Sequence, residues 1–188
     1  MSVAFRRTIF KLLLISAAIS IEVLSPFRAL CQQDAVNVRA AYLFNILKYV
    51  NWPPDQSEIK VTVLADDRTS SVLIQVVNGK KIGGRDIRVL KHSSNVDLDS
   101  ADVLYVQQAF EVSFRSAVDR LLRRQNHPIL TIGETDQFLS YGGMFSLLRS
   151  IDRIQLEANA DAIETTSLKI SSGLLNIATI RRFERSRK

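Results

Sequence analysis

The 188-residue sequence has little of several residue types on which small proteins depend for stability or chemistry, with one Cys, two His, one Trp and four Pro. A single Cys excludes an internal disulfide framework, and two His are too few for most structural zinc sites. No apolar run reaches the roughly 20 residues that a transmembrane helix needs. What remains, 46% hydrophobic and 23% charged residues, is typical of a globular protein, and the length predicts one domain.

Positive charge is concentrated at the two ends of the chain. Residues 1–31 carry a net charge of +3 and residues 181–188 a net charge of +4, which leaves −1 for residues 32–180. A nucleic-acid-binding domain carries its basic residues on the domain itself. The near-neutral body therefore argues against DNA or RNA as a partner, despite the overall charge of +6.

The first 31 residues have the organisation of an export signal. Basic residues precede a short apolar run at 12–21, and the predicted cleavage lies between Cys31 and Gln32. Two alternatives stay open: lipidation at Cys31, which the bulky Leu30 disfavours, and retention as a membrane anchor, which Glu22 disfavours. The sequence thus predicts an exported, periplasmic protein whose mature form has no cysteine.

The order of the predicted elements favours a single α/β domain over residues 32–181, followed by a basic C-terminal tail at residues 182–188. Hydrophobic periodicity and turn residues predict a mixed, largely parallel sheet flanked by helices, with an antiparallel C-terminal hairpin. The predicted helices are residues 36–50, 72–77, 112–124 and 168–180. The predicted strands are residues 59–64, 87–90, 103–106, 128–132, 144–148 and 154–157.

Catalytic and cofactor-binding motifs are not evident in the sequence. The G-x-G-x-x-G fingerprint is absent, and the glycines and lysines of residues 78–84 lack the spacing of a phosphate-binding loop. His92 and His127 show no metal-ligand spacing, and no G-x-S-x-G motif accompanies them. We therefore expect a non-enzymatic protein that holds no metal or cofactor, with a hydrolase that uses one of these histidines as an alternative.

Two pairs of residues are candidates for binding a small ligand. Asp66 and Asp67 follow a predicted strand, where α/β proteins often place functional carboxylates, and helix capping is the alternative interpretation. Gly142 and Gly143 suit a backbone with positive φ or the close approach of a ligand, and a purely structural strand start is the alternative.

Tyr49 and Trp52, at the end of the first predicted helix, are candidates for binding a partner protein. The alternative for Trp52 is a buried plug at the corner before two prolines. A group of acidic residues near the end of the hairpin is interpreted as a solvated helix face and not as a cation site. These residues are Glu157, Asp161 and Glu164.

Three segments together carry a family resemblance. They are residues 40–53 (AAYLFNILKYVNWP), residues 129–144 (ILTIG, then Phe138 and Gly-Gly-Met) and residues 154–178 (IQLEAN, then LKISSGLLNIA). In this order they resemble the YfiR-like family of periplasmic proteins, over about residues 36–181.

The resemblance implies an exported, non-enzymatic regulator with an α/β fold that is often a homodimer. The best-known member restrains an inner-membrane diguanylate cyclase by binding its periplasmic sensor region, and an outer-membrane lipoprotein relieves that restraint. The output is cyclic di-GMP and hence biofilm formation. Because the mature chain lacks cysteine, the disulfides of that member are not carried over.

Two functional hypotheses follow. The first is a regulator that restrains a diguanylate cyclase, or another membrane receptor, through a surface near Tyr49 and Trp52. The alternative is a periplasmic sensor that binds a small ligand beside the two candidate pairs, Asp66–Asp67 and Gly142–Gly143, and signals to a membrane receptor.

Overall fold

The computed structural model describes residues 25–54, 56–91, 100–112, 115, 129–150 and 153–183, with side chains from residue 35 onward. The chain forms two units, Met1–Val36 and Asn37–Lys188. The first unit is described only as the N-terminal part of helix α2 (Ser25–Lys48). Pro26 lies in the first turn of this helix, where a missing N–H is tolerated. The second unit contains the rest of α2 and every strand described.

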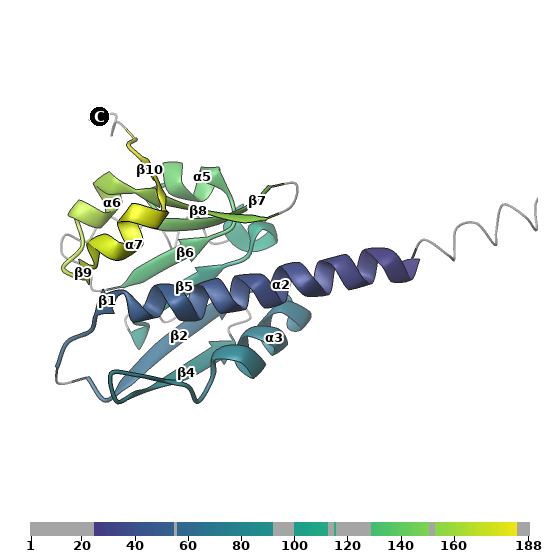
Figure 1. Ribbon diagram of the computed structural model, residues 1–188, viewed down its shortest axis with the longest axis horizontal. Coiled ribbons are helices and arrows are strands. Elements are labelled where there is room, and N and C mark those ends of the chain that lie inside the picture. The colour runs from purple at the N-terminus through teal and green to yellow at the C-terminus, as the bar shows by residue number, and fades with distance from the viewer. Residues whose placement is uncertain are drawn as a thin grey trace, which may run out of the picture. The chain divides into compact units, whose positions relative to one another are not determined.

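An eight-stranded sheet of order β10-β8-β7-β6-β5-β2-β4-β3 forms the centre of the second unit (Figure 1). Its strands are β2 (Glu58–Leu64), β3 (Lys81–Ile82), β4 (Arg85–Lys91), β5 (Val103–Val106), β6 (Leu130–Gly133), β7 (Phe145–Arg149), β8 (Ile154–Asn159) and β10 (Thr179–Arg181). The β3–β4 and β7–β8 pairs are antiparallel, and the other neighbours are parallel. The predicted largely parallel sheet with a C-terminal antiparallel hairpin is confirmed.

The remaining elements are short. A separate two-stranded sheet pairs β1 (Val50–Asn51) with β9 (Lys169–Ile170). Among the described residues, the helices after α2 are α3 (Asp67–Val77), the 3-10 turn η2 (Gln108–Phe110), α5 (Asp136–Ser140), α6 (Ala160–Glu164) and α7 (Ser172–Ile177). A helix of five or six residues is not stable alone, so α5, α6 and α7 depend on tertiary packing.

The two faces of the sheet carry different side chains because successive residues of a strand point to opposite sides. On one face Leu104 and Val106 of β5 form a buried cluster with Phe138 of α5. On the other face Tyr105 points toward α2, where its hydroxyl meets Glu134. All four residues of β5 and of β6 are buried, as expected for central parallel strands that are covered on both faces.

Phe138 occupies a slot that only glycines allow. A Cβ built on Gly133 comes within 2.3 Å of the Phe138 ring, and one built on Gly143 within 2.1 Å. The side chain is 2% exposed. Gly142 has φ of 100°, a conformation that favours glycine. The close approach to Gly143 is thus made by the protein's own Phe138.

The C-terminal helix predicted for residues 168–180 is wrong. The chain there forms β9, the six-residue α7 and β10. Helix α7 begins only after Ser171, which is its N-cap: the Ser171 hydroxyl accepts a hydrogen bond from Gly173 N–H. The flanking residues pair with distant strands, β9 with β1 and β10 with β8.

Residues 78–84 are mostly exposed and contain β3, which forms a hairpin with β4 through Gly83 and Gly84, both with positive φ as in a type I′ turn. The interpretation of the acidic residues as a solvated helix face is wrong for Glu157, which is 5% exposed on β8. The helix predicted at residues 112–124 lies almost wholly outside the described residues.

Replacing Gly143 with Ala is expected to lower the free energy of unfolding by about 1 to 3 kcal/mol, because the new methyl group overlaps the buried Phe138 ring. Gly84→Ala is the matched control: its Cβ meets nothing within 4 Å, so only its φ of 83° is strained, at a cost of about 1 kcal/mol. Urea unfolding measures both. If the overlap with the Phe138 ring causes the loss, Gly143→Ala should cost less free energy of unfolding in a chain that also carries Phe138→Leu than in the wild type. An equal cost in both chains contradicts this explanation.

Candidate functional site

Helix α2 has one side in the core and another side exposed. The buried side consists of residues three or four apart that are at most 1% exposed, namely Ala40, Leu43, Ile46 and Leu47. A second stripe at helical spacing runs along the outside from Val38, 42% exposed, to Tyr49, 39% exposed just beyond the helix.

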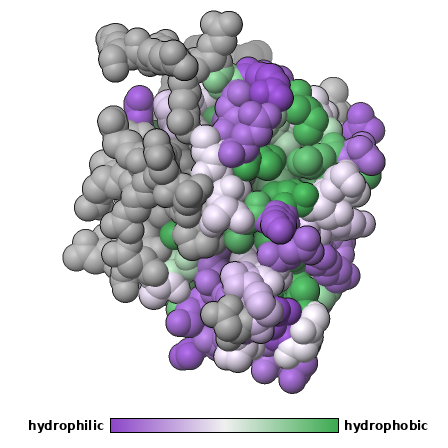
Figure 2. All heavy atoms as spheres, turned by 90° about the vertical axis from the view of Figure 1, so that its left-hand side faces the viewer, coloured by the Kyte–Doolittle hydropathy of each residue, from purple (hydrophilic) through white to green (hydrophobic). Residues whose placement is uncertain are grey.

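This outer stripe forms one wall of a groove of about 670 Å³. Leu174 and Ile177 of α7 line the groove opposite α2, and Leu156 of β8 lies between them. The α2 side contributes Val38, Ala41, Tyr42, Asn45, Ile46, Lys48 and Tyr49. Ile177 is 65% exposed, which is unusual for a large apolar side chain. Figure 2, which faces the side that carries β1 and β9, shows apolar residues exposed among hydrophilic ones.

The two-stranded sheet holds the walls of the groove together. Val50 pairs with Ile170, and Ser171 N–H donates to Tyr49 O at 2.8 Å. The Tyr49 ring lies against Gly173, where an added Cβ would be 3.3 Å from the ring. The end of α2 and the start of α7 are therefore joined by backbone hydrogen bonds, although about 120 residues separate them.

Trp52, the other predicted partner-binding residue, does not line the groove. It is 7% exposed, and its indole Nε1 donates to Leu47 O at 3.0 Å. Arg85 closes the same corner by donating to Pro53 O at 2.9 Å. The indole thus packs at the end of α2, whereas Tyr49 offers an exposed ring beside it.

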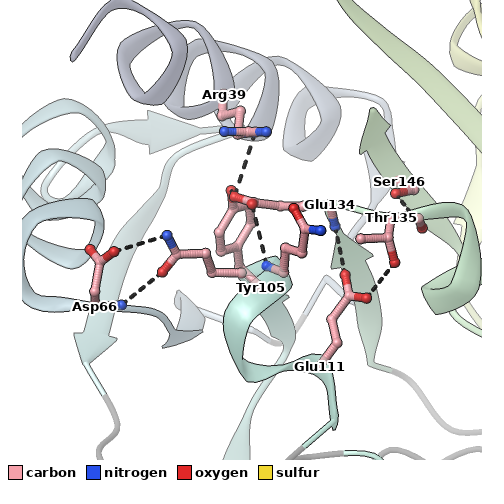
Figure 3. A network of polar contacts seen from close by, with 9 residues as sticks. Arg39, Asp66, Tyr105, Glu111, Glu134, Thr135 and Ser146 are labelled. Atoms are coloured by element: carbon pink, nitrogen blue, oxygen red, sulfur yellow. Dashed lines mark hydrogen bonds and ion pairs between the residues drawn. The ribbon is translucent and has the colours of Figure 1, made fainter. Parts of the chain in front are cut away.

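A polar network lies on the α2 side of the sheet, at the carboxyl ends of β2, β5 and β6 (Figure 3). It is buried at Tyr105, Glu111 and Glu134 and exposed at Asp66. The chain passes from β2 to β4 on one side and then returns to β5 on the other side of β2. Ligands of open α/β sheets commonly bind at such a switch point. Here the two loops are joined directly: Asp66 N–H donates to Gln107 Oε1 at 2.8 Å, and Gln107 Nε2 donates to Asp66 Oδ2 at 2.9 Å.

Arg39 of α2 lies above the centre of this network. Its buried Nε is 3.5 Å from Glu134 Oε1 and makes no hydrogen bond. Tyr105 OH donates to the same Glu134 oxygen at 2.5 Å, and Gln108 N–H donates to the other at 3.3 Å. Burial, together with the Glu134 charge, raises the pKa of Tyr105 well above its ordinary value. The phenol therefore remains a hydrogen-bond donor to Glu134.

Glu111 supports the loop that follows β6. It accepts hydrogen bonds from Glu134 N–H at 3.1 Å and from the Thr135 hydroxyl. Burial raises the pKa of Glu111, and the nearby Glu134 charge adds to this, while the two hydrogen bonds act in the opposite direction. Thr135 in turn caps α5, whose Phe138 N–H donates to Thr135 Oγ1 at 3.2 Å.

The four candidate ligand-binding residues belong to separate local arrangements. Asp66 caps α3 by accepting from Thr69 N–H at 2.7 Å. Partial burial alone would raise the pKa of Asp66, but the hydrogen bonds from Thr69 and Gln107 outweigh it and lower the pKa. Asp67 is exposed and pairs with Lys91. Gly143 lies against the Phe138 ring, and Gly142 N–H donates to Leu139 O at 2.9 Å. A ligand role for the four residues stays a prediction.

Several residues of this region were not predicted from the sequence. Arg39, Tyr105 and Glu134 come from three distant elements, and no spacing links them. Ile177 was expected inside a longer helix. His92 and His127 lie outside the described residues. Within the described part of the chain, no group of three or more His, Cys, Asp or Glu residues is placed to hold a metal ion.

The acidic residues near the hairpin form ion pairs with the start of the C-terminal tail. Arg182 binds Asp161 at 3.1 Å and Glu164 at 2.9 Å, and Phe183 N–H donates to Asp161 at 2.7 Å. These contacts fix the chain after the edge strand β10. Among the described residues, no helix is both long enough and apolar enough to cross a membrane.

Comparison with known proteins identifies the family. The family model described as YfiR/HmsC-like matches residues 36–179, so the chain belongs to this family. Membership indicates a periplasmic, generally non-enzymatic regulator of the kind that acts in cyclic di-GMP signalling. A solved structure, a conserved domain protein from Vibrio cholerae, shares the fold with a TM-score of 0.50 at 14% identity. The match covers 77% of this chain and 59% of that chain.

Replacing Glu111 with Gln is expected to change how stability depends on pH. The pKa of Glu111 is raised above its ordinary 4.5, so the folded chain binds this proton more tightly than the unfolded chain does. Its stabilising contribution is complete below pH 4.5 and is lost as the pH rises through the folded-state pKa. Since Gln does not titrate, the stability of the wild type minus that of Glu111→Gln falls over this window and then levels off. Urea unfolding across a pH series measures it, and a difference that rises with pH contradicts the account.

Proposed function

We propose that this member of the YfiR/HmsC-like family binds the periplasmic sensor region of an inner-membrane diguanylate cyclase and holds it in an inactive arrangement. Export by residues 1–31, with cleavage between Cys31 and Gln32, delivers the residue 32–181 domain and its 182–188 tail to the periplasm. The result is a lower concentration of cyclic di-GMP in the cytoplasm. An outer-membrane lipoprotein that competes for the regulator relieves the restraint.

The observation that carries this proposal is the groove between α2 and α7. Large apolar side chains are exposed there together: Val38 at 42%, Tyr49 at 39% and Ile177 at 65%. Contiguous exposed apolar surface of this kind is typical of a protein-binding site. Tyr49, a residue type enriched among interface anchors, lies at the end where β1 and β9 hold both walls in place.

Restraint of a cyclase requires the groove to prefer one state of the sensor region. A shift of a two-state equilibrium from 1:99 to 99:1 needs an affinity difference of about 10⁴-fold, or about 5.5 kcal/mol. Burying one large apolar side chain contributes about 1.5 to 3 kcal/mol. Because the three side chains are only 39% to 65% exposed, covering them supplies about 2 to 4 kcal/mol, and the apolar side chains of the partner that become buried against them must supply the rest. Both must be covered in only one state of the sensor region.

The first test is the cyclic di-GMP content of the native host after deletion of the gene, with related copies also removed. Deletion is expected to raise it, and the full chain, but not a chain that lacks residues 1–31, is expected to restore it. Ile177→Asp is expected to fail to restore it, because a charged group cannot be buried against an apolar partner without a large loss of affinity.

Ile74→Asp is the matched control, since Ile74 is 37% exposed on α3 and does not line the groove. Immunoblots establish that all variants accumulate equally in the periplasm. Full restoration by Ile177→Asp contradicts the groove as the docking surface. An unchanged cyclic di-GMP content after deletion contradicts the restraint of a cyclase altogether.

A further inference from the structure

The secondary structure around the groove restricts the kind of segment that fits it. Its walls are the helices α2 and α7, and its floor is a side chain of β8. Strand β8 is hydrogen-bonded to β7 on one side and to β10 on the other, so it offers no free edge there. An extended peptide binds by adding a strand to a free edge, whereas a groove between helices accepts an amphipathic helix.

Two polar side chains that line the groove are bonded within the protein. Tyr42 OH donates to Ile154 O at 3.2 Å, and Lys48 Nζ donates to Asn45 Oδ1 at 3.0 Å. Small-molecule sites need a few convergent polar groups to orient the ligand. The groove instead presents apolar surface over most of its length, which suits an apolar helix face.

The charge at one end of the groove is positive. Of the described residues that line the groove, Lys48 alone is charged. The Lys48 ammonium lies 4.3 Å from the centroid of the Phe44 ring, which Lys80 also contacts without lining the groove. Lys48 is exposed and forms no ion pair with a described carboxylate. A carboxylate on the occupant complements this charge.

The length of the α2 stripe sets the length of the occupant. From Val38 to Tyr49 the stripe advances eleven residues, or roughly 16 Å at 1.5 Å per residue. We propose that the occupant is an amphipathic helix of about three turns in the partner, with its apolar face in the groove and a carboxylate against Lys48. This inference rests on the proposed function, because the partner is the sensor region of the cyclase.

The test uses the purified periplasmic region of the cyclase whose output rises on deletion of the gene, together with the full exported chain. The dissociation constant of the complex between the two proteins is measured at low and high salt for the wild type, Lys48→Met and Lys48→Glu. We expect Lys48→Glu to weaken binding roughly 5- to 10-fold at low salt and less at high salt. The affinity of Lys48→Met should lie between those of the wild type and Lys48→Glu. Arg88→Glu, an equal charge change at an exposed position of β4 outside the groove, should leave binding unchanged within about twofold.

Hydrogen exchange on the sensor region tests the helix. We expect binding to protect one stretch of about eleven residues that carries apolar residues at three- and four-residue spacing and an acidic residue. Protection that falls on a strand overturns the helical occupant.

The remaining outcomes separate this inference from the proposed function. If Ile177→Asp abolishes binding while Lys48→Glu binds as the wild type does, the groove remains the docking surface and the acidic helix is wrong. If neither variant weakens binding, both the groove and its occupant are wrong.

Discussion

The proposed docking surface of this protein lies next to a very short stretch of paired backbone. Two residues of β1 pair with two residues of β9, and Ser171 N–H adds a hydrogen bond to Tyr49 O. This pairing attaches a C-terminal segment to the end of α2. It also places the six-residue α7, which is too short to be stable alone, opposite the exposed stripe of α2. The buried Leu174 and the pairing of β10 with β8 hold the other end of α7.

The same fold fills the place where open α/β sheets commonly bind ligands. At the switch point between β2 and β5, Asp66 and Gln107 bond to each other and join the two loops. Above them Arg39 of α2 lies against Glu134, to which Tyr105 donates. Protein side chains thus engage most of the polar groups described at this place, although the buried Arg39 Nε makes no hydrogen bond. The exposed apolar surface lies instead between α2 and α7, which favours a protein partner over a small molecule.

Much of the sheet could be predicted because each central strand has a continuous apolar run that needs burial on both faces. The helix start at Asp66 was predictable from its capping residue, and the β7–β8 hairpin from two apolar runs and a short polar link. The C-terminal prediction failed because residues 168–180 have a helical pattern of apolar residues, whereas the structure depends on the Ser171 cap and on pairing with β1 and β8. Local periodicity carries no information about such distant partners.

The candidate site was predictable only in part, for the same reason. Tyr49 was predicted from its place at the end of a helix. Ile177 lines the groove only because α7 lies opposite α2, which the sequence does not indicate. The glycine pair predicted that another group approaches closely at Gly143, but not which group. Phe138 makes this contact because of how α5 packs, and α5 is too short to be recognised from its periodicity.

The most direct test of the central claim, that the α2–α7 groove is the surface covered by the partner, is hydroxyl-radical footprinting of the full exported chain with and without the cyclase sensor region. The account predicts that Tyr49 and Ile177 lose reactivity in the complex while Ile74, equally apolar and on α3, keeps it. Unchanged reactivity at Tyr49 and Ile177, with protection elsewhere on the chain, would contradict it.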